Sequence, residues 1–350
     1  MRKILSIILL LSMLHTLVLP ASAMDFTAPA APNDVQKYMP EDTASFADGL
    51  WYVVRTTLAS IKPDFMESVR SCIMIVAITL MLAIAGSISK VSEKVVCLLT
   101  AVSLGMVMLS SGKTFINIGI DTIERVGDYG KLLFPVLTAA AAANGAPTSA
   151  AALHVGTLIF ISVLSGILSS CIVPLIYIYM ALSFADCALH NDAFCELKKF
   201  VKWLTTWSIK IVLYIFTGYM GVTGAISGSV DSAALKATKL TISGAVPVVG
   251  GILADASESI LVSAGILKNA AGLYGFFAIV AICLGPFLKI GLQYWLLKLT
   301  TSICGIFAHK KAVSLLGEMS STMGLVLAMT GSICLLLLIS VVCFIRSGVL

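Results

Sequence analysis

Charged side chains are scarce in this sequence. They make up 12% of the 350 residues, whereas a soluble globular domain carries about 25%. The deficit is concentrated in long windows, and residues 153–185 contain no charge at all. Such windows are typical of helices surrounded by lipid, and they exclude a single water-soluble domain. With 59% hydrophobic residues, the composition predicts an all-α, polytopic integral membrane protein.

The residues from which catalytic and metal sites are built are also few or scattered. There are four histidines and nine cysteines, and most of the cysteines lie inside apolar runs at irregular spacing. The pattern indicates small buried side chains instead of a disulfide framework. No Ser/His pair, paired carboxylates or four-ligand metal motif stands out. We therefore predict no enzymatic activity, no catalytic residues, no metal and no cofactor.

The net charge of +5 is modest, and the basic residues form short clusters between the apolar runs. A nucleic-acid-binding protein needs a continuous basic face instead. The clusters are better explained as topology signals, because short cytoplasmic loops of membrane proteins are rich in lysine and arginine. We predict that the chain contacts the lipid bilayer and no nucleic acid.

The first 23 residues have the pattern of an export signal. Arg2 and Lys3 precede an apolar stretch, and Ala21-Ser22-Ala23 forms a small-x-small cleavage site. An uncleaved first membrane anchor is the alternative. In either case residues 24–70 follow on the far side of the membrane. They form an extracytoplasmic arm with an amphipathic helix expected from about Thr43, and residues 71–350 form the polytopic transmembrane domain.

The first part of that domain reads as a helical hairpin. Residues 71–88 and 95–111 are two spans, and Lys90 and Lys94 place the turn between them in the cytoplasm. Residues 112–131 carry charges that cancel, and we expect them to form a separate interfacial helix. Residues 132–143 contain Pro135 and are too short to span comfortably, so a short span and a re-entrant hairpin fit equally well.

The charge-free stretch 153–185 is too long for one upright helix, and Ser169-Ser170 with Pro174 supplies a break. We therefore predict two spans there. The remaining expectations are a cytoplasmic loop (190–202), a span (203–226), a second amphipathic region (228–272), a span (271–297), a cytoplasmic turn (309–311) and a final span (323–345). About seven crossings, with the mature N-terminus outside, place every basic turn on one side.

Residues 244–261, Gly-Ala-Val-Pro-Val-Val-Gly-Gly-Ile-Leu-Ala-Asp-Ala-Ser-Glu-Ser-Ile-Leu, are followed by Ile-Leu-Lys-Asn-Ala-Ala-Gly at 266–272. This segment resembles the stage III sporulation protein AE family. The export signal, extracytoplasmic arm, first hairpin and long hydrophobic C-terminal half occur in the family's order, so the resemblance covers essentially the whole mature chain.

The resemblance implies a component of endospore-forming bacteria that acts with other stage III sporulation proteins. It implies a location in the mother-cell membrane around the forespore. There the family belongs to a trans-envelope complex, likened to a secretion apparatus or feeding channel, that supports forespore development. It brings no catalytic residues with it.

Broken helices are the strongest candidates for a functional element. In lipid, an interrupted helix leaves backbone groups unpaired, and it persists only against protein or a water-filled cavity. The elements around Pro135 and Pro247 lie at comparable places in the two halves, as in transporters with inverted repeats. Structural re-entrant loops without a passage are the alternative. The candidate pore residues are Pro135, Pro247, Gly250, Gly251, Asp255 and Glu258.

Other notable residues have simpler explanations. Lys210 and Lys289 lie within predicted spans and are expected to reach the cytoplasmic interface with their long side chains. A row of glycines allows close packing on a neighbouring helix or on a second copy of the chain; its members are Gly218, Gly221, Gly224 and Gly228.

The leading function is a membrane-embedded subunit of the channel or secretion-like complex between mother cell and forespore. One alternative is a self-contained secondary transporter or permease for a small solute. Another is a structural anchor that recruits partner proteins through its arm and amphipathic regions. The sequence leaves these alternatives open.

Overall fold

The computed structural model describes residues 28–40, 46–88, 93–143, 147–189, 192–222 and 270–347. All regular structure within these ranges is helical, which confirms the predicted all-α membrane bundle. The elements are α2 (Asn33–Gln36), α3 (Phe46–Ser60), α4 (Lys62–Ile88), α5 (Glu93–Ala143), α6 (Pro147–Ile167), the π-helical turn η1 (Leu168–Ile172), α7 (Val173–Leu189), α8 (Asp192–Val222), α11 (Ala270–Cys304) and α12 (Lys310–Ser347).

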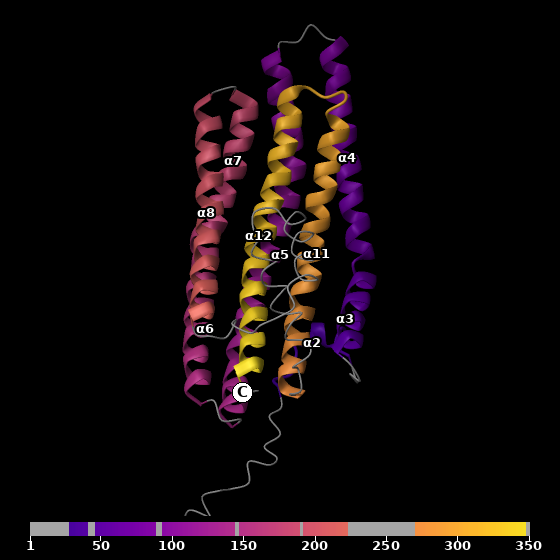
Figure 1. Ribbon diagram of the computed structural model, residues 1–350. Coiled ribbons are helices and arrows are strands. Elements are labelled where there is room, and N and C mark those ends of the chain that lie inside the picture. The colour runs from indigo at the N-terminus through magenta and orange to yellow at the C-terminus, as the bar shows by residue number, and fades with distance from the viewer. Residues whose placement is uncertain are drawn as a thin grey trace, which may run out of the picture.

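The long helices lie side by side along one axis (Figure 1). Five helical segments of the described chain are long and apolar enough to cross a membrane. They lie in α4, in α5, in the combined α6–α7 rod, in α11 and in α12, whereas α8 is not among them. The chain is thus a multi-pass membrane protein.

Helix α12 occupies the centre of the bundle and contacts α5, α6, α7, α8 and α11. Close approach to α5 depends on small residues, as is usual where helices pack in lipid. A Cβ atom at Gly119 would lie 2.8 Å from the terminal methyl of Met329, and one at Gly130 would lie 2.7 Å from Leu337. Both contacts are too short for a side chain, so glycine sets the spacing of α5 and α12.

Helix α5 corrects the expectations for residues 112–143. A single helix of 51 residues continues through the predicted interfacial helix and through Pro135. Neither alternative predicted for residues 132–143, a separate short span or a re-entrant hairpin, is formed, because the helix continues through them. The proline lacks an N–H, but its neighbours Leu133 and Phe134 are fully buried, and Pro135 itself lies on the exposed side of the helix. Packing of the buried face outweighs the loss of one backbone hydrogen bond.

The stretch predicted to form two spans is one continuous rod. Helices α6 and α7 are joined by the π-helical turn η1, whose flanking residues both keep right-handed helical backbone angles. The turn includes Ser169 and Ser170, so the irregularity lies at the predicted position. A π turn accommodates a proline just beyond it, here Pro174, without ending the helix.

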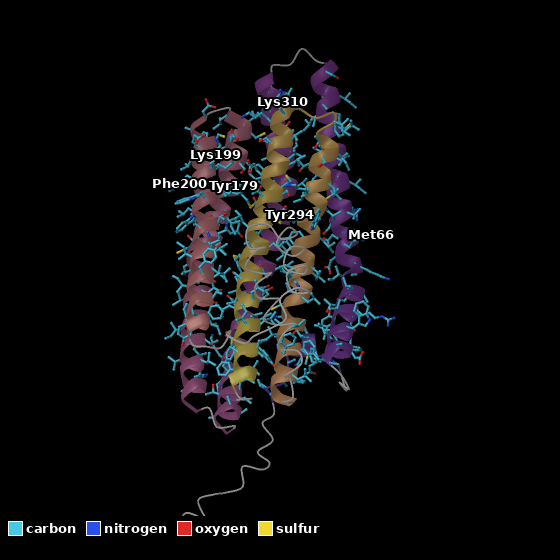
Figure 2. All side chains as sticks on the ribbon, in the orientation of Figure 1. Met66, Tyr179, Lys199, Phe200, Tyr294 and Lys310 are labelled. Atoms are coloured by element: carbon cyan, nitrogen blue, oxygen red, sulfur yellow. The ribbon has the colours of Figure 1, made fainter. Side chains whose placement is uncertain are left out.

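The predicted loop 190–202 is also helical from Asp192 onward, because α8 begins there. The end of α4, the start of α5, the end of α7, the start of α8 and the turn between α11 and α12 all lie toward one end of the bundle (Figure 1). Lys199 and Lys310 both lie toward that end (Figure 2). This agrees with the predicted clustering of basic turns on one side of the membrane.

The amphipathic helix expected after Thr43 is present as α3, which packs on α11. Phe46 lies 5.3 Å from Phe276 and 5.6 Å from Phe277 between ring centroids. The helix is two-sided, because Val53 is fully buried whereas Leu58 is 51% exposed. The predicted boundary between the arm and the transmembrane domain at residue 71 falls inside a helix, because α4 already begins at Lys62.

Candidate functional site

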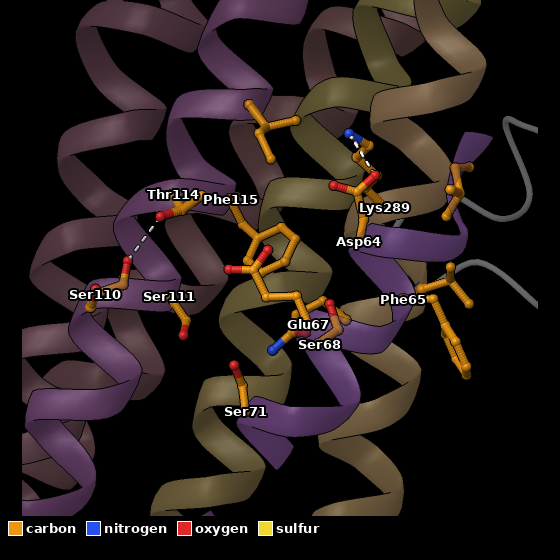
Figure 3. Close-up of a pocket in the computed structure, with 14 residues that line it drawn as sticks. Asp64, Phe65, Glu67, Ser68, Ser71, Ser110, Ser111, Thr114, Phe115 and Lys289 are labelled. Carbon is orange, nitrogen blue, oxygen red and sulfur yellow. Dashed lines mark hydrogen bonds and ion pairs between the residues drawn. The ribbon is translucent and has the colours of Figure 1, made fainter. Parts of the chain in front are cut away.

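A polar cavity of about 160 Å³ lies between α4, α5 and α11 (Figure 3). It is notable because α4 and α5 supply long apolar spans directly beside it. Its polar lining consists of Asp64, Glu67, Ser68 and Ser71 from α4, Ser110, Ser111 and Thr114 from α5, and Lys289 and Gln293 from α11. We call it the α4–α5–α11 cavity.

An ion pair closes one side of this cavity. Lys289 Nζ lies 2.9 Å from Asp64 Oδ2, and the two side chains are 34% and 38% exposed. Lys289 therefore pairs with the residue that leads into the first span. The predicted snorkelling of Lys289 to the cytoplasmic interface is wrong, because a carboxylate on α4 lies within its reach.

Gln293 contributes a polar group without a partner. Its side chain is 2% exposed, and its Oε1 accepts no hydrogen bond from any described residue. Leaving a buried carbonyl oxygen unpaired costs about 1–3 kcal/mol.

The remaining lining also presents acceptors. The Thr114 hydroxyl donates to the Ser110 carbonyl at 3.2 Å, so its lone pairs remain available. Glu67 extends from α4 toward Phe115 on α5 (Figure 3) and forms no ion pair within the described chain. With Asp64 neutralised by Lys289, Glu67 leaves the cavity with one excess negative charge.

A second feature is the charged side of α5 beyond the cavity. It consists of exposed residues that repeat at helical spacing. Lys131 pairs with Asp128 at 2.8 Å, and Arg125 pairs with Asp34 at 2.6 Å. We call this the α5 charged face, and its members are Lys113, Asp121, Glu124, Arg125, Asp128 and Lys131.

The adjacent side of the bundle at the same level is apolar. Cβ atoms at Gly127 and Gly130 would lie 3.9 Å and 3.5 Å from Ile161 on α6. Residues 127–130 of α5 therefore lie beside Ile161, at the same height in the bundle. The outward residues of α6 near this level are Ile159 and Val163, which are 55% and 47% exposed. One side therefore suits lipid and the other suits water or a polar partner.

A third feature is a buried ion-pair network that joins α7, α8 and α12. Lys198 Nζ lies 2.8 Å from Asp186 and 3.1 Å from Glu318, and Lys311 lies 3.2 Å from Asp186. Tyr179 donates a hydrogen bond to Glu318. Burial alone would lower the pKa of Lys198, but the two carboxylates raise it, so its ammonium group stays charged.

Residues 41–348 match the family model described as stage III sporulation protein AE. The chain belongs to that family. The stage III sporulation protein AE of Bacillus subtilis (strain 168) is 24% identical over 264 residues, which cover 75% of this chain and 65% of that protein. The match thus spans less than two thirds of the relative's length. No solved structure matches.

The structure describes only part of the predicted site. Pro135 lies on the exposed side of α5, below the cavity, and is not brought together with it. Pro247, Gly250, Gly251, Asp255 and Glu258 lie outside the described residues, as do Gly224 and Gly228. A Cβ atom at Gly218 would meet nothing within 4 Å, so this glycine contacts no neighbouring helix. Gly221 lies in the last turn of α8.

The α4–α5–α11 cavity could not be predicted from the sequence. Its residues come from three helices whose register is fixed only by packing, and serines in spans are common. One signal was present: Lys289 and Gln293 are polar residues four positions apart inside an apolar segment, so they share one face of α11.

Proposed function

We propose that this chain is a membrane-embedded subunit of a multi-protein conduit between mother cell and forespore. In this proposal it resides in the mother-cell membrane and assembles with other stage III sporulation proteins. Membership of the family supports the sporulation role, and the two-sided surface of the bundle supports the conduit. The proposed role requires no covalent chemistry.

One observation carries the proposal. The part of the α5 charged face at Asp128 and Lys131 lies at the level at which α6 exposes Ile159 and Val163. Charged side chains at a lipid surface are costly, and in membrane proteins they face water or protein partners. A subunit with one apolar side and one charged side is suited to form part of a wall, with lipid behind it and a polar passage or partner in front.

Cysteine labelling tests this arrangement. Cys171 is exposed and Cys195 is partly exposed, whereas the other seven cysteines are buried, so a Cys171→Ser, Cys195→Ser background leaves little native reactivity. In membranes from sporulating cells we expect Asp128→Cys, which lies at the level of Ile161, to react with a charged maleimide. Ile159→Cys, its matched control on the apolar side, should stay protected.

Equal protection of both positions would defeat the assignment of α5 to a polar passage. Co-purification from the same membranes tests the assembly separately. We expect other stage III sporulation proteins to be recovered with the tagged chain. Recovery of the tagged chain alone, together with solute uptake by the purified chain in liposomes, would favour the self-contained transporter instead.

A further inference from the structure

Helix α5 has one exposed side that changes character along the helix. Toward the α4 connection this side is apolar, and farther along it becomes the α5 charged face. The exposed apolar residues recur every three or four positions, so they share one side of the helix. We call them the α5 apolar stripe, and its members, each 45–72% exposed, are Val95, Leu98, Leu99, Val102, Met106 and Leu109.

The α5 apolar stripe lies at the level of the basic turns. Cys97 Sγ on α5 lies 3.9 Å from His309 Nδ1, immediately before α12 begins. The apolar run of α12 starts only at Met323, 14 positions after His309, which corresponds to about 20 Å along a helix. Helices α4 and α5 also reach beyond the turn between α11 and α12 (Figure 1). The apolar stripe of α5 is therefore displaced from the apolar run of α12.

The α5 charged face, in contrast, lies beside the apolar run of α12. Cβ atoms at Gly119 and Gly130, within this part of α5, would contact Met329 and Leu337. At the same level α6 exposes apolar side chains such as Ile159. Along α5 the order of apolar and charged residues is thus the reverse of the order along α12.

One hydrocarbon layer, about 30 Å thick, cannot cover both apolar levels completely. A layer placed on the α5 apolar stripe would surround Lys199 and Lys310, which are exposed toward that end of the bundle (Figure 2). Charged side chains in hydrocarbon are costly, so the layer lies on the apolar run of α12. The stripe then lies beyond the lipid, where an exposed apolar patch marks a protein interface.

We propose that the α5 apolar stripe is a contact between two copies of this chain. This goes beyond the proposed function, because it names the partner that covers one surface. The partner must present an apolar surface at the level of the basic turns. A second copy in the same orientation does so, because a two-fold axis along the membrane normal brings identical patches together at the same height.

Charge also supports a second copy. The α5 charged face continues the stripe on the same side of the helix, and its basic and acidic members are equal in number. Two copies of this face therefore carry no net charge and do not repel each other. When the apolar stripes meet, the charged faces lie opposite each other at the lipid level. Both are then shielded from lipid, which removes the cost of charge in hydrocarbon.

Cysteine crosslinking in membranes from sporulating cells tests the contact, in the same double-serine background as the labelling of α5. Leu99→Cys, Val102→Cys and Met106→Cys each place a thiol on the stripe. Oxygen with copper phenanthroline as catalyst should join two copies of at least one variant by a disulfide, which gives a band of twice the mass that a reductant removes. Tyr214→Cys on α8, at a side chain that is 62% exposed, is the matched control. Its crosslinked fraction should be at least tenfold smaller.

Native mass measurement of the purified full-length chain in mild detergent tests the contact without introduced cysteines. The wild type should have the mass of a dimer or a higher multiple. Val102→Lys, Met106→Lys should shift the chain to a monomer with unchanged helical content by circular dichroism, because both side chains are exposed in the single chain. Tyr214→Lys should keep the mass of the wild type.

Any of four results would overturn the contact: no crosslink at any stripe position, a monomeric wild type, equal crosslinking of Tyr214→Cys, or crosslinks from the stripe only to a different protein. The third would reflect random collision, and the fourth would assign the stripe to another subunit. Neither the labelling of Asp128→Cys nor the co-purification measures a contact between copies, so this proposal and the proposed function fail separately.

Discussion

Lys198 Nζ lies 2.8 Å from Asp186 Oδ2, and this contact joins α8 to α7 at the end of the bundle where the basic turns gather. The side chains are only 6% and 9% exposed. Glu318 brings α12 to the same lysine at 3.1 Å. Helix α8 packs on α7 and α12. These ion pairs fix its position along both helices.

Removal of the lysine charge should therefore be costly. Lys198→Met leaves Glu318 with the Tyr179 hydrogen bond and one distant ion pair, to Lys202 at 4.0 Å, and loss of one partner of a buried pair costs about 3–5 kcal/mol. We expect a clear fall in Tm, measured by thermal unfolding in detergent. Lys199→Met is the matched control, because Lys199 is 65% exposed and pairs only with Glu196; its effect should stay below about 1 kcal/mol.

The pH dependence follows from the same group. The pKa of Lys198 is raised above its ordinary value of 10.5, so its stabilising contribution is fully present below that value. The contribution is lost only as the pH rises through the higher folded-state pKa. Tm of the wild type should therefore exceed that of Lys198→Met by a constant amount from pH 7 to pH 9, and a difference that vanishes within this range would contradict the assignment.

Glycine spacing of α5 and α12 gives another prediction. At Gly119 a Cβ atom would lie 2.8 Å from Met329 and 3.0 Å from Thr330. Gly119→Leu should force the two helices apart and lower stability by about 1–3 kcal/mol. Gly166→Leu is the control, because nothing lies within 4 Å of its Cβ position. Equal Tm values for the two variants would show that the helices are not this close.

Hydrogen bonds tie the segment around α2 to the bundle. The Tyr129 hydroxyl donates to the Pro29 carbonyl at 3.2 Å, and the Ala31 N–H donates to the Tyr274 hydroxyl at 3.3 Å. Each such bond contributes about 0.5–1.5 kcal/mol. The double variant Tyr129→Phe, Tyr274→Phe should increase the rate of proteolytic cleavage within residues 28–40, while the helical bundle stays intact. Tyr214→Phe, at a side chain that is 62% exposed, should leave the cleavage rate unchanged.

Because the basic turns lie toward one end of the bundle, we expect its two ends to face opposite sides of the membrane. In the Cys171→Ser, Cys195→Ser background, Lys310→Cys places a thiol near one end of the bundle, and Asn33→Cys places one in α2, toward the opposite end (Figure 1). An impermeant maleimide added to intact cells before engulfment should label Asn33→Cys and spare Lys310→Cys, with both labelled after permeabilisation. Labelling of both positions in intact cells would disprove the topology.

The sequence predicted those elements whose signal lies within one short segment of the chain. The charge-free runs 71–88 and 95–111 lie in α4 and α5, and the serine pair at 169–170 lies in the π-helical turn. Continuity was harder to predict. Pro135 reads as a break, but the helix persists because Leu133 and Phe134 are buried against distant segments, and only the tertiary structure brings these segments together.

The cavity illustrates the same limit. Asp64 and Lys289 are separated by more than two hundred positions, and no periodicity within either helix indicates that they pair. Lys210 and Lys289 looked alike in sequence, as single lysines within apolar helices. Only Lys289 has an ion pair in the described structure, because α4 places Asp64 beside it.

The length of α5 has a mechanical consequence. Its 51 residues extend about 76 Å at 1.5 Å per residue, more than twice the thickness of a hydrocarbon layer of about 30 Å. The helix is therefore too long to lie wholly within such a layer along its normal. Because it is continuous, residues at its two ends that lie on opposite sides of the layer belong to one rigid element.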